Sequence, residues 1–62
     1  MRAREIVQLA RQHGYTYSHT SGSHMIYVKA GSTPLSIPGP DNRMVSPGVA
    51  RNLVQQITGG KP

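Results

Sequence analysis

The residues most able to do chemistry in this chain of 62 residues are its three histidines, His13, His19 and His24. Histidine can accept and donate protons near neutral pH because the ordinary pKa of imidazole is about 6.5. The absence of cysteine excludes thiolate nucleophiles, thiolate metal sites and disulfides. The only two acids, Glu5 and Asp41, lie far apart in the sequence, which disfavours carboxylate-pair and magnesium chemistry. Composition therefore excludes much hydrolase chemistry.

The histidine spacing also bears on metals. No pair follows the His-x-His or His-x3-His spacing that puts two ligands on one element, so we expect no metal site and no cofactor. Taken alone, His24 is most simply a strand-end histidine bonded to a backbone carbonyl, and His13 a solvated helix end.

The charge balance is strongly basic. Seven Lys or Arg stand against two acids, which gives a net charge of +5 and an isoelectric point near 10.5. This is the electrostatic footprint of a nucleic-acid binder, although an acidic protein partner would also suit it. No apolar run approaches the roughly 20 residues that span a bilayer, and the N-terminus lacks the apolar core of a signal peptide. We expect a cytoplasmic protein without a membrane partner.

Two amphipathic helices are predicted, one near each end of the chain. In "RAREIVQLARQHG", apolar residues recur at steps of three and four, and Gly14 follows as a C-cap glycine (Ala3, Ile6, Val7, Ala10). In "SPGVARNLVQQI", Ser46 is the expected N-cap and Pro47 the first helical residue, with a second apolar stripe (Ala50, Leu53, Val54, Ile57). These two stripes can cover one face of a sheet.

A β-hairpin is predicted between them. The runs "YTYSH" and "HMIYVK" flank Thr20-Ser21-Gly22-Ser23, which reads as a four-residue loop. That loop length predicts a register in which His19 faces His24, Tyr17 faces Ile26 and Tyr15 faces Val28. These pairs would form the apolar face, and the remaining side chains would form the other face (Thr16, Ser18, Met25, Tyr27, Lys29).

The letters Gly-Ser-His-Met at 22–25 also match the remnant that tag removal leaves. Their position between two strands that share an apolar face favours a turn that belongs to the fold.

"PLSIP" supplies a third strand with Leu35 and Ile37 on the apolar face. The predicted fold class is α+β: a two-layer α-β-β-β-α domain whose three-stranded antiparallel sheet carries both helices on one face. We expect one domain over residues 1–57 and a flexible tail over residues 58–62.

The segments "REIVQLARQHGY", "GSHMIY", "LSIP" and "SPGVARNLVQQI" resemble, in order and spacing, the HicA family of bacterial toxins. The resemblance runs from Arg4 to Ile57. It implies a fold like the double-stranded RNA-binding domain, a ribonuclease toxin acting on mRNA, and neutralisation by a HicB antitoxin. The sequence departs from the family where His19 replaces a frequent basic residue, and where Met25 follows the Gly-Ser-His.

The resemblance assigns the catalytic role to His24, as the proton-transfer residue of metal-independent RNA cleavage. From the predicted register we infer that His19 is a second acid or base, or a phosphate clamp. Gly22 and Ser23 could offer backbone amides to a phosphate, although turn formation alone would explain them.

Candidate RNA contacts come from basic residues and from the start of the second helix. They are Lys29, Arg43 and Arg51, with the N-terminus of the second helix at Ser46 to Gly48 as an anion site through its free amides. Of these, Arg51 matches the arginine of the family's last helix. Solubility alone is the alternative role of each basic side chain.

Two other functions fit the same residues: a binding module that grips RNA without cutting it, and a small protein-interaction domain. The sequence leaves open the cleavage specificity, self-association and the identity of an antitoxin.

Overall fold

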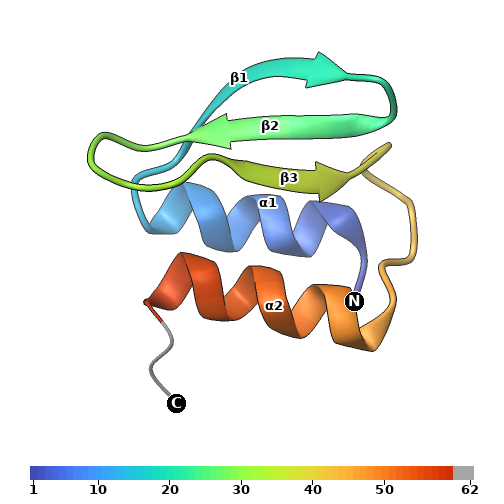
Figure 1. Cartoon of the computed structure of the whole chain (residues 1–62). Coiled ribbons are helices and arrows are strands. Elements are labelled where there is room, and N and C mark those ends of the chain that lie inside the picture. The colour runs from blue at the N-terminus through green and yellow to red at the C-terminus, as the bar shows by residue number, and fades with distance from the viewer. Residues whose placement is uncertain (60–62) are drawn as a thin grey trace.

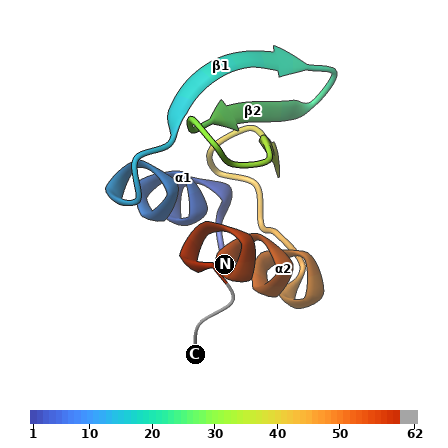
Figure 2. The same cartoon turned by 60° about the vertical axis from the view of Figure 1, so that its left-hand side comes forward.

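The computed structural model describes residues 1–59, which form two layers (Figure 1). The elements, in chain order, are α1 (Ala3–Gln12), β1 (Thr16–Ser21), β2 (His24–Val28), β3 (Leu35–Pro38) and α2 (Pro47–Thr58). The sheet is antiparallel in the order β1-β2-β3, and both helices lie on one of its faces (Figure 2). The predicted fold class is confirmed. Neither helix in the described part of the chain is long and apolar enough to cross a membrane.

The start and end of α1 follow from local chemistry. The backbone N–H of Arg2 donates to Oε1 of Glu5 at 2.7 Å, which satisfies one N–H group that the helix start leaves without a backbone partner. Gly14 follows with φ of +92°, a conformation that costs glycine little, and the chain turns there toward β1. The predicted apolar stripe is the buried face (Ala3, Ile6, Val7, Ala10).

In α2, Ser46 occupies the N-cap position and Pro47 the first turn, as predicted, although no side chain caps the helix. Ala50, Leu53 and Ile57 are buried and Val54 is half-buried. The helix extends one residue beyond the predicted domain end, to Thr58, whose hydroxyl donates to the carbonyl of Val54. The predicted tail residues 60–62 lie outside the described residues.

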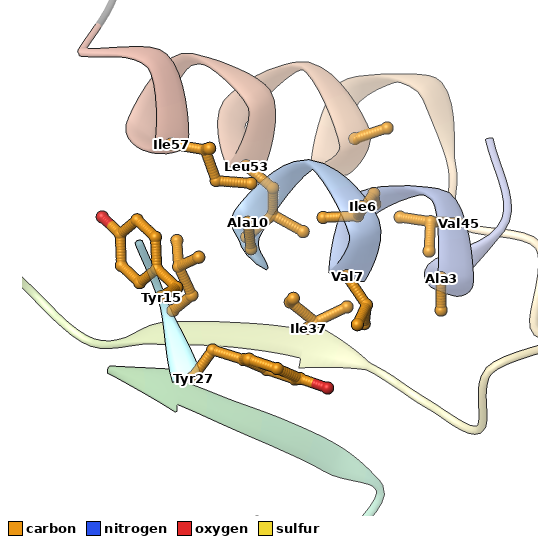
Figure 3. Packing of buried hydrophobic residues seen from close by; sticks show 12 residues of the cluster. Ala3, Ile6, Val7, Ala10, Tyr15, Tyr27, Ile37, Val45, Leu53 and Ile57 are labelled. Atoms are coloured by element: carbon orange, nitrogen blue, oxygen red, sulfur yellow. The ribbon is translucent and has the colours of Figure 1, made fainter. Parts of the chain in front are cut away.

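One hydrophobic core lies between the sheet and the helices (Figure 3). Its fully buried members include Ile6 of α1 with Leu35 and Ile37 of β3. The strand β3 contacts both helices, which also contact each other. Tyr15 and Tyr27 close the core from the loop after α1 and from β2.

The hairpin differs from the prediction. The loop has two residues, Gly22 and Ser23, because Ser21 pairs with His24, and His19 pairs with Ile26. The register shifts between Tyr17 and His19, so Ser18 is an extra residue in β1, a β-bulge.

The predicted faces were consequently wrong as well. Met25 and Tyr27 point toward the helices, opposite Ile37 and Leu35, whereas Ile26 lies on the other face. Tyr27 is 3% exposed, whereas Tyr17 is 51% exposed and Val28 is 36% exposed.

The physical reason is the size of the buried area. A tyrosine ring buries more apolar surface than an isoleucine or valine side chain, so placing Tyr27 in the core gives the more stable register. The bulge at Ser18 then lets Tyr17 lie against Tyr27, with ring centroids 5.6 Å apart in an edge-to-face arrangement.

This register makes opposite predictions for the two tyrosines. Tyr27→Ala should lower the free energy of unfolding by about 3–5 kcal/mol, because it empties a core position. Tyr17→Ala should cost only about 0.5–1.5 kcal/mol, the worth of an aromatic pair. Urea unfolding followed by circular dichroism measures both, and the four-residue loop register would predict the reverse order.

Candidate functional site

The hairpin turn determines where His24 lies. Gly22 has φ of +60°, which glycine adopts readily and which closes the tight two-residue loop. Since β2 begins at His24, the imidazole follows directly after the turn, opposite Ser21 on one side and Pro38 on the other. His24 is exposed, and strand alternation places it on the sheet face that the helices leave free, because its neighbour Met25 faces the core.

His19 and His24 do not face each other directly, so that predicted pairing was wrong. His19 pairs with Ile26, two residues beyond His24, and therefore lies on the same open face. Diagonal neighbours of this kind are about 7–8 Å apart in regular antiparallel sheet. His19 and His24 are therefore diagonal neighbours on one face of the sheet.

The side chain of His19 is oriented by its neighbour. Oγ of Ser18 lies 3.0 Å from Nδ1 of His19, within hydrogen-bond distance. This contact engages one ring nitrogen and leaves Nε2 available to a ligand. The β-bulge at Ser18 therefore also affects the orientation of the His19 ring.

The hairpin turn, the end of β3 and the start of α2 lie at one end of the molecule, together with the N-terminus (Figure 1). The connecting loop at 39–45 is tied on both sides. The N–H of Gly39 donates to the carbonyl of Ser23 at 2.8 Å, and the N–H groups of Ala3 and Arg4 donate to Arg43 and Asp41 at 2.9 Å. The backbone thus fixes this loop beside the hairpin turn.

A cavity of about 550 Å³ opens between the hairpin turn and this loop, with largely apolar walls. Its lining residues come from the hairpin and from the loop after β3 (Thr20, Gly22, Ser23, Met25, Gly39, Pro40, Asp41, Asn42). No sequence pattern indicated a role for the loop residues 39–42. Antiparallel pairing of β2 with β3 was the available signal, since it brings the end of β3 beside the start of β2.

Arg43 lies at the same end as His24. Its Nη1 is 3.5 Å from the carbonyl oxygen of Gly39, the residue after the cross-strand partner of His24. A hollow of about 190 Å³ extends from Pro38 and Arg43 to Ser46 and Val49.

A second hollow, of about 640 Å³, continues along the start of α2 and includes Ser46, Gly48 and Arg51. No side chain caps α2, so its first amides are not engaged by the N-cap residue. The structure therefore connects Arg43, the α2 N-terminus and Arg51 through neighbouring hollows.

Lys29 lies elsewhere. It follows the end of β2, roughly 16 Å from His24 at about 3.3 Å per strand residue. Its ammonium group is 5.4 Å from the ring centroid of Tyr15, and its methylene groups pack beside Gly14. Of the predicted basic contacts, Arg43 and Arg51 share an end of the fold with His24, and Lys29 does not.

No cluster of three or more His, Cys, Asp or Glu side chains within residues 1–59 could hold a metal ion. The arrangement offers the imidazoles of His19 and His24 on an open sheet face, a neighbouring cavity, and a basic strip formed by Arg43, the start of α2 and Arg51. Together these groups suit proton transfer on an anionic ligand.

Comparison with known proteins agrees with the fold and with the sequence motifs. Residues 3–58 match the family model described as the HicA toxin of bacterial toxin–antitoxin systems. No curated protein and no solved structure matches the chain. The match covers nearly all of the chain and includes both helices and all three strands, so this protein belongs to the HicA toxin family.

Proposed function

We propose that this toxin is an endoribonuclease that cleaves mRNA in the bacterial cytoplasm, with His24 as the proton-transfer residue and without a metal ion. The observation that carries the proposal is the position of His24 in a chain of this family: exposed, directly after the turn, on the open face of the sheet. Arg43 and the start of α2 lie at the same end and could bind phosphates.

The proposed reaction uses the ribose 2'-hydroxyl as nucleophile. His24 takes the hydroxyl proton while the 2'-oxygen attacks the adjacent phosphorus. The bond from phosphorus to the 5'-oxygen breaks, and the leaving oxygen takes up a proton. The products are a 2',3'-cyclic phosphate and a 5'-hydroxyl. A positioned acid or base of this kind typically contributes about 10²- to 10⁴-fold in rate.

His19 is proposed as the second group, either the acid that protonates the leaving 5'-oxygen or a clamp for the phosphate. Its position on the same face as His24, one residue pair along the strands, supports this role. The contact of Ser18 with Nδ1 leaves Nε2 for the substrate. Gly22 and Ser23 form the turn beside His24, where their amides could also contact the phosphate.

The phosphates that flank the cut are proposed to bind Arg43, Arg51 and the backbone N–H groups of Ser46 and Gly48, since Pro47 between them has none. Their connection through neighbouring hollows supports a single strand running from the hairpin turn along the start of α2. Lys29 could contact only a phosphate several nucleotides away, because it lies at the other end of β2. A HicB-like antitoxin is the proposed inhibitor, covering the open face or the basic strip.

The first prediction concerns His24. His24→Ala should abolish growth arrest on induced expression, and should lower cleavage of single-stranded RNA in EDTA by about 10²-fold or more. His13→Ala is the matched control, since His13 lies at the C-terminal end of α1, and it should behave as wild type. Equal cleavage by the His24→Ala and wild-type proteins would refute the role of His24, and binding of RNA without cleavage by either protein would favour an RNA-binding module.

The second prediction concerns His19. His19→Gln should slow RNA cleavage by at least about tenfold, as loss of an acid or a clamp requires. A nucleoside 3'-phosphate ester of 4-nitrophenol separates the two roles, because nitrophenolate leaves without protonation. If His19 is the acid, the variant cleaves this ester as fast as wild type, and if it is a clamp the defect persists. Undiminished RNA cleavage would exclude both roles.

The third prediction concerns salt. In the His24→Ala background, Arg43→Gln and Arg51→Gln should each weaken RNA binding and reduce the slope of log K against log salt by about 0.7, the value for one phosphate on a single strand. Arg11→Gln makes the same charge change in the last turn of α1, away from Arg43 and Arg51, and should leave the slope unchanged. A protein-interaction domain would show no RNA affinity for salt to weaken.

A further inference from the structure

The cavity between the hairpin turn and the loop after β3 has no role in the proton transfer described above. Two of its lining residues, Ser23 and Met25, flank His24 in the chain. Met25 and Thr20 face the helix side of the sheet, whereas His24 faces the open side, so the cavity and the imidazole lie on opposite faces at the hairpin end. An RNA strand that passes around this end with a phosphate at His24 would bring an adjacent base to the cavity mouth. We propose that this cavity receives an unstacked guanine base next to the scissile phosphate, and that Asp41 reads its Watson–Crick edge. The inference rests on the proposed ribonuclease function and adds a base preference to it.

The walls of the cavity suit a flat aromatic base. Met25 packs partly against the core and presents a polarisable side chain, while Gly39 and Pro40 supply apolar surface on the other wall. The approach of the walls depends on Gly39: a Cβ there would lie 3.2 Å from Cγ of Met25 and 3.3 Å from the carbonyl oxygen of Ser23. Single-stranded RNA is commonly recognised by holding a splayed base in such a site.

The cavity is also preformed. The N–H of Gly39 joins the two walls through the carbonyl of Ser23. The loop wall is fixed to the start of α1 by two hydrogen bonds. The backbone carbonyl of Asp41 accepts from the N–H of Arg4, and the backbone carbonyl of Asn42 accepts from Nη1 of Arg2 at 2.8 Å. A preformed site loses little conformational entropy when a ligand binds.

Asp41 points to guanine among the four bases. A carboxylate has two acceptor oxygens and no donor. Guanine is the base whose Watson–Crick edge offers two adjacent donors, N1–H and the N2 amino group. Adenine and cytosine place a ring-nitrogen acceptor beside their amino group, and uracil flanks its N3–H with carbonyl oxygens, so each would bring an acceptor against the carboxylate.

The charge of Asp41 supports a recognition role. It is one of two acids in a chain of net charge +5, and an acid beside a phosphate site weakens RNA attraction. The other acid, Glu5, bonds the backbone at the start of α1. Within residues 1–59, only the backbone carbonyl of Asp41 takes part in a hydrogen bond, and its side chain is exposed. The fold therefore does not use the carboxylate.

The test compares wild type with Asp41→Asn. A single-stranded RNA pool containing all four bases is digested in EDTA and the cut sites are sequenced. Wild type should favour cuts next to guanine by about tenfold or more, as expected of a paired base contact. Asp41→Asn should lose that preference while binding non-guanine RNA more tightly at low salt, because a negative charge is removed. Glu5→Gln makes the same charge change and should retain the guanine preference.

A binding experiment separates this proposal from the ribonuclease itself. Guanosine 5'-monophosphate should shift the amide NMR signals of Ser23, Gly39 and Asn42 in wild type, adenosine 5'-monophosphate should not, and the shifts should disappear in Asp41→Asn. Asp41→Ser serves as a second variant, with circular dichroism to verify the fold.

Guanine binding without any RNA cleavage would refute the proposed ribonuclease function and support the guanine pocket. Cleavage next to all four bases at equal rates, or equal amide shifts with both nucleotides, would refute the guanine pocket and leave the proposed ribonuclease function standing. If guanosine 5'-monophosphate causes no amide shift, the guanine pocket is also refuted. That result would be expected if the cavity receives only a side chain of an antitoxin.

Discussion

The burial of Tyr27 against the helices sets the geometry of the rest of the sheet. Because successive side chains of a strand point to opposite faces, placing Met25 and Tyr27 in the core forces His24 and Ile26 onto the open face. A shift of one residue would reverse every side chain in β2 and bury the imidazole beneath the sheet. The accessibility of the proposed catalytic residue is thus a consequence of hydrophobic packing one and three residues away.

The core is small, and the proposed site depends on it directly. Both helices pack on β3, and the fully buried side chains come from α1 and β3 (Ile6, Leu35, Ile37). The first residues of α1 also hold the loop at 39–45 through backbone hydrogen bonds. The same helix therefore supplies core side chains and positions the wall of the cavity beside His24, so a loss of packing under α1 would disturb both.

The separation of layers explains how a strongly basic chain can keep a compact core. No charged side chain is buried within residues 1–59. The helices cover one face of the sheet (Figure 2). His19 and His24 lie on the other face, and Arg43 and Arg51 lie at the end of the fold. The proposed catalytic and phosphate-binding groups can then differ without affecting the residues that stabilise the domain.

The sequence by itself determined the two helices, the three strands and the fold class. The apolar positions of α1 and α2 recur with the helical period over several turns, and Pro47 and Gly14 mark a start and an end, so local physics is sufficient there. The motif order also predicted the family, which the family match over residues 3–58 confirms, whereas the role of His24 stays a proposal.

Only the tertiary structure decided the hairpin register, the faces of β1 and β2, and the loop wall beside His24. A strand pattern such as Tyr15 to Tyr27, with aromatic or aliphatic residues on both faces, fits two registers equally well. The choice was made by contacts with β3 and the helices, which lie far away in the sequence, and by the bulge at Ser18. The cavity arose for the same reason, since its two walls meet only when β3 pairs with β2.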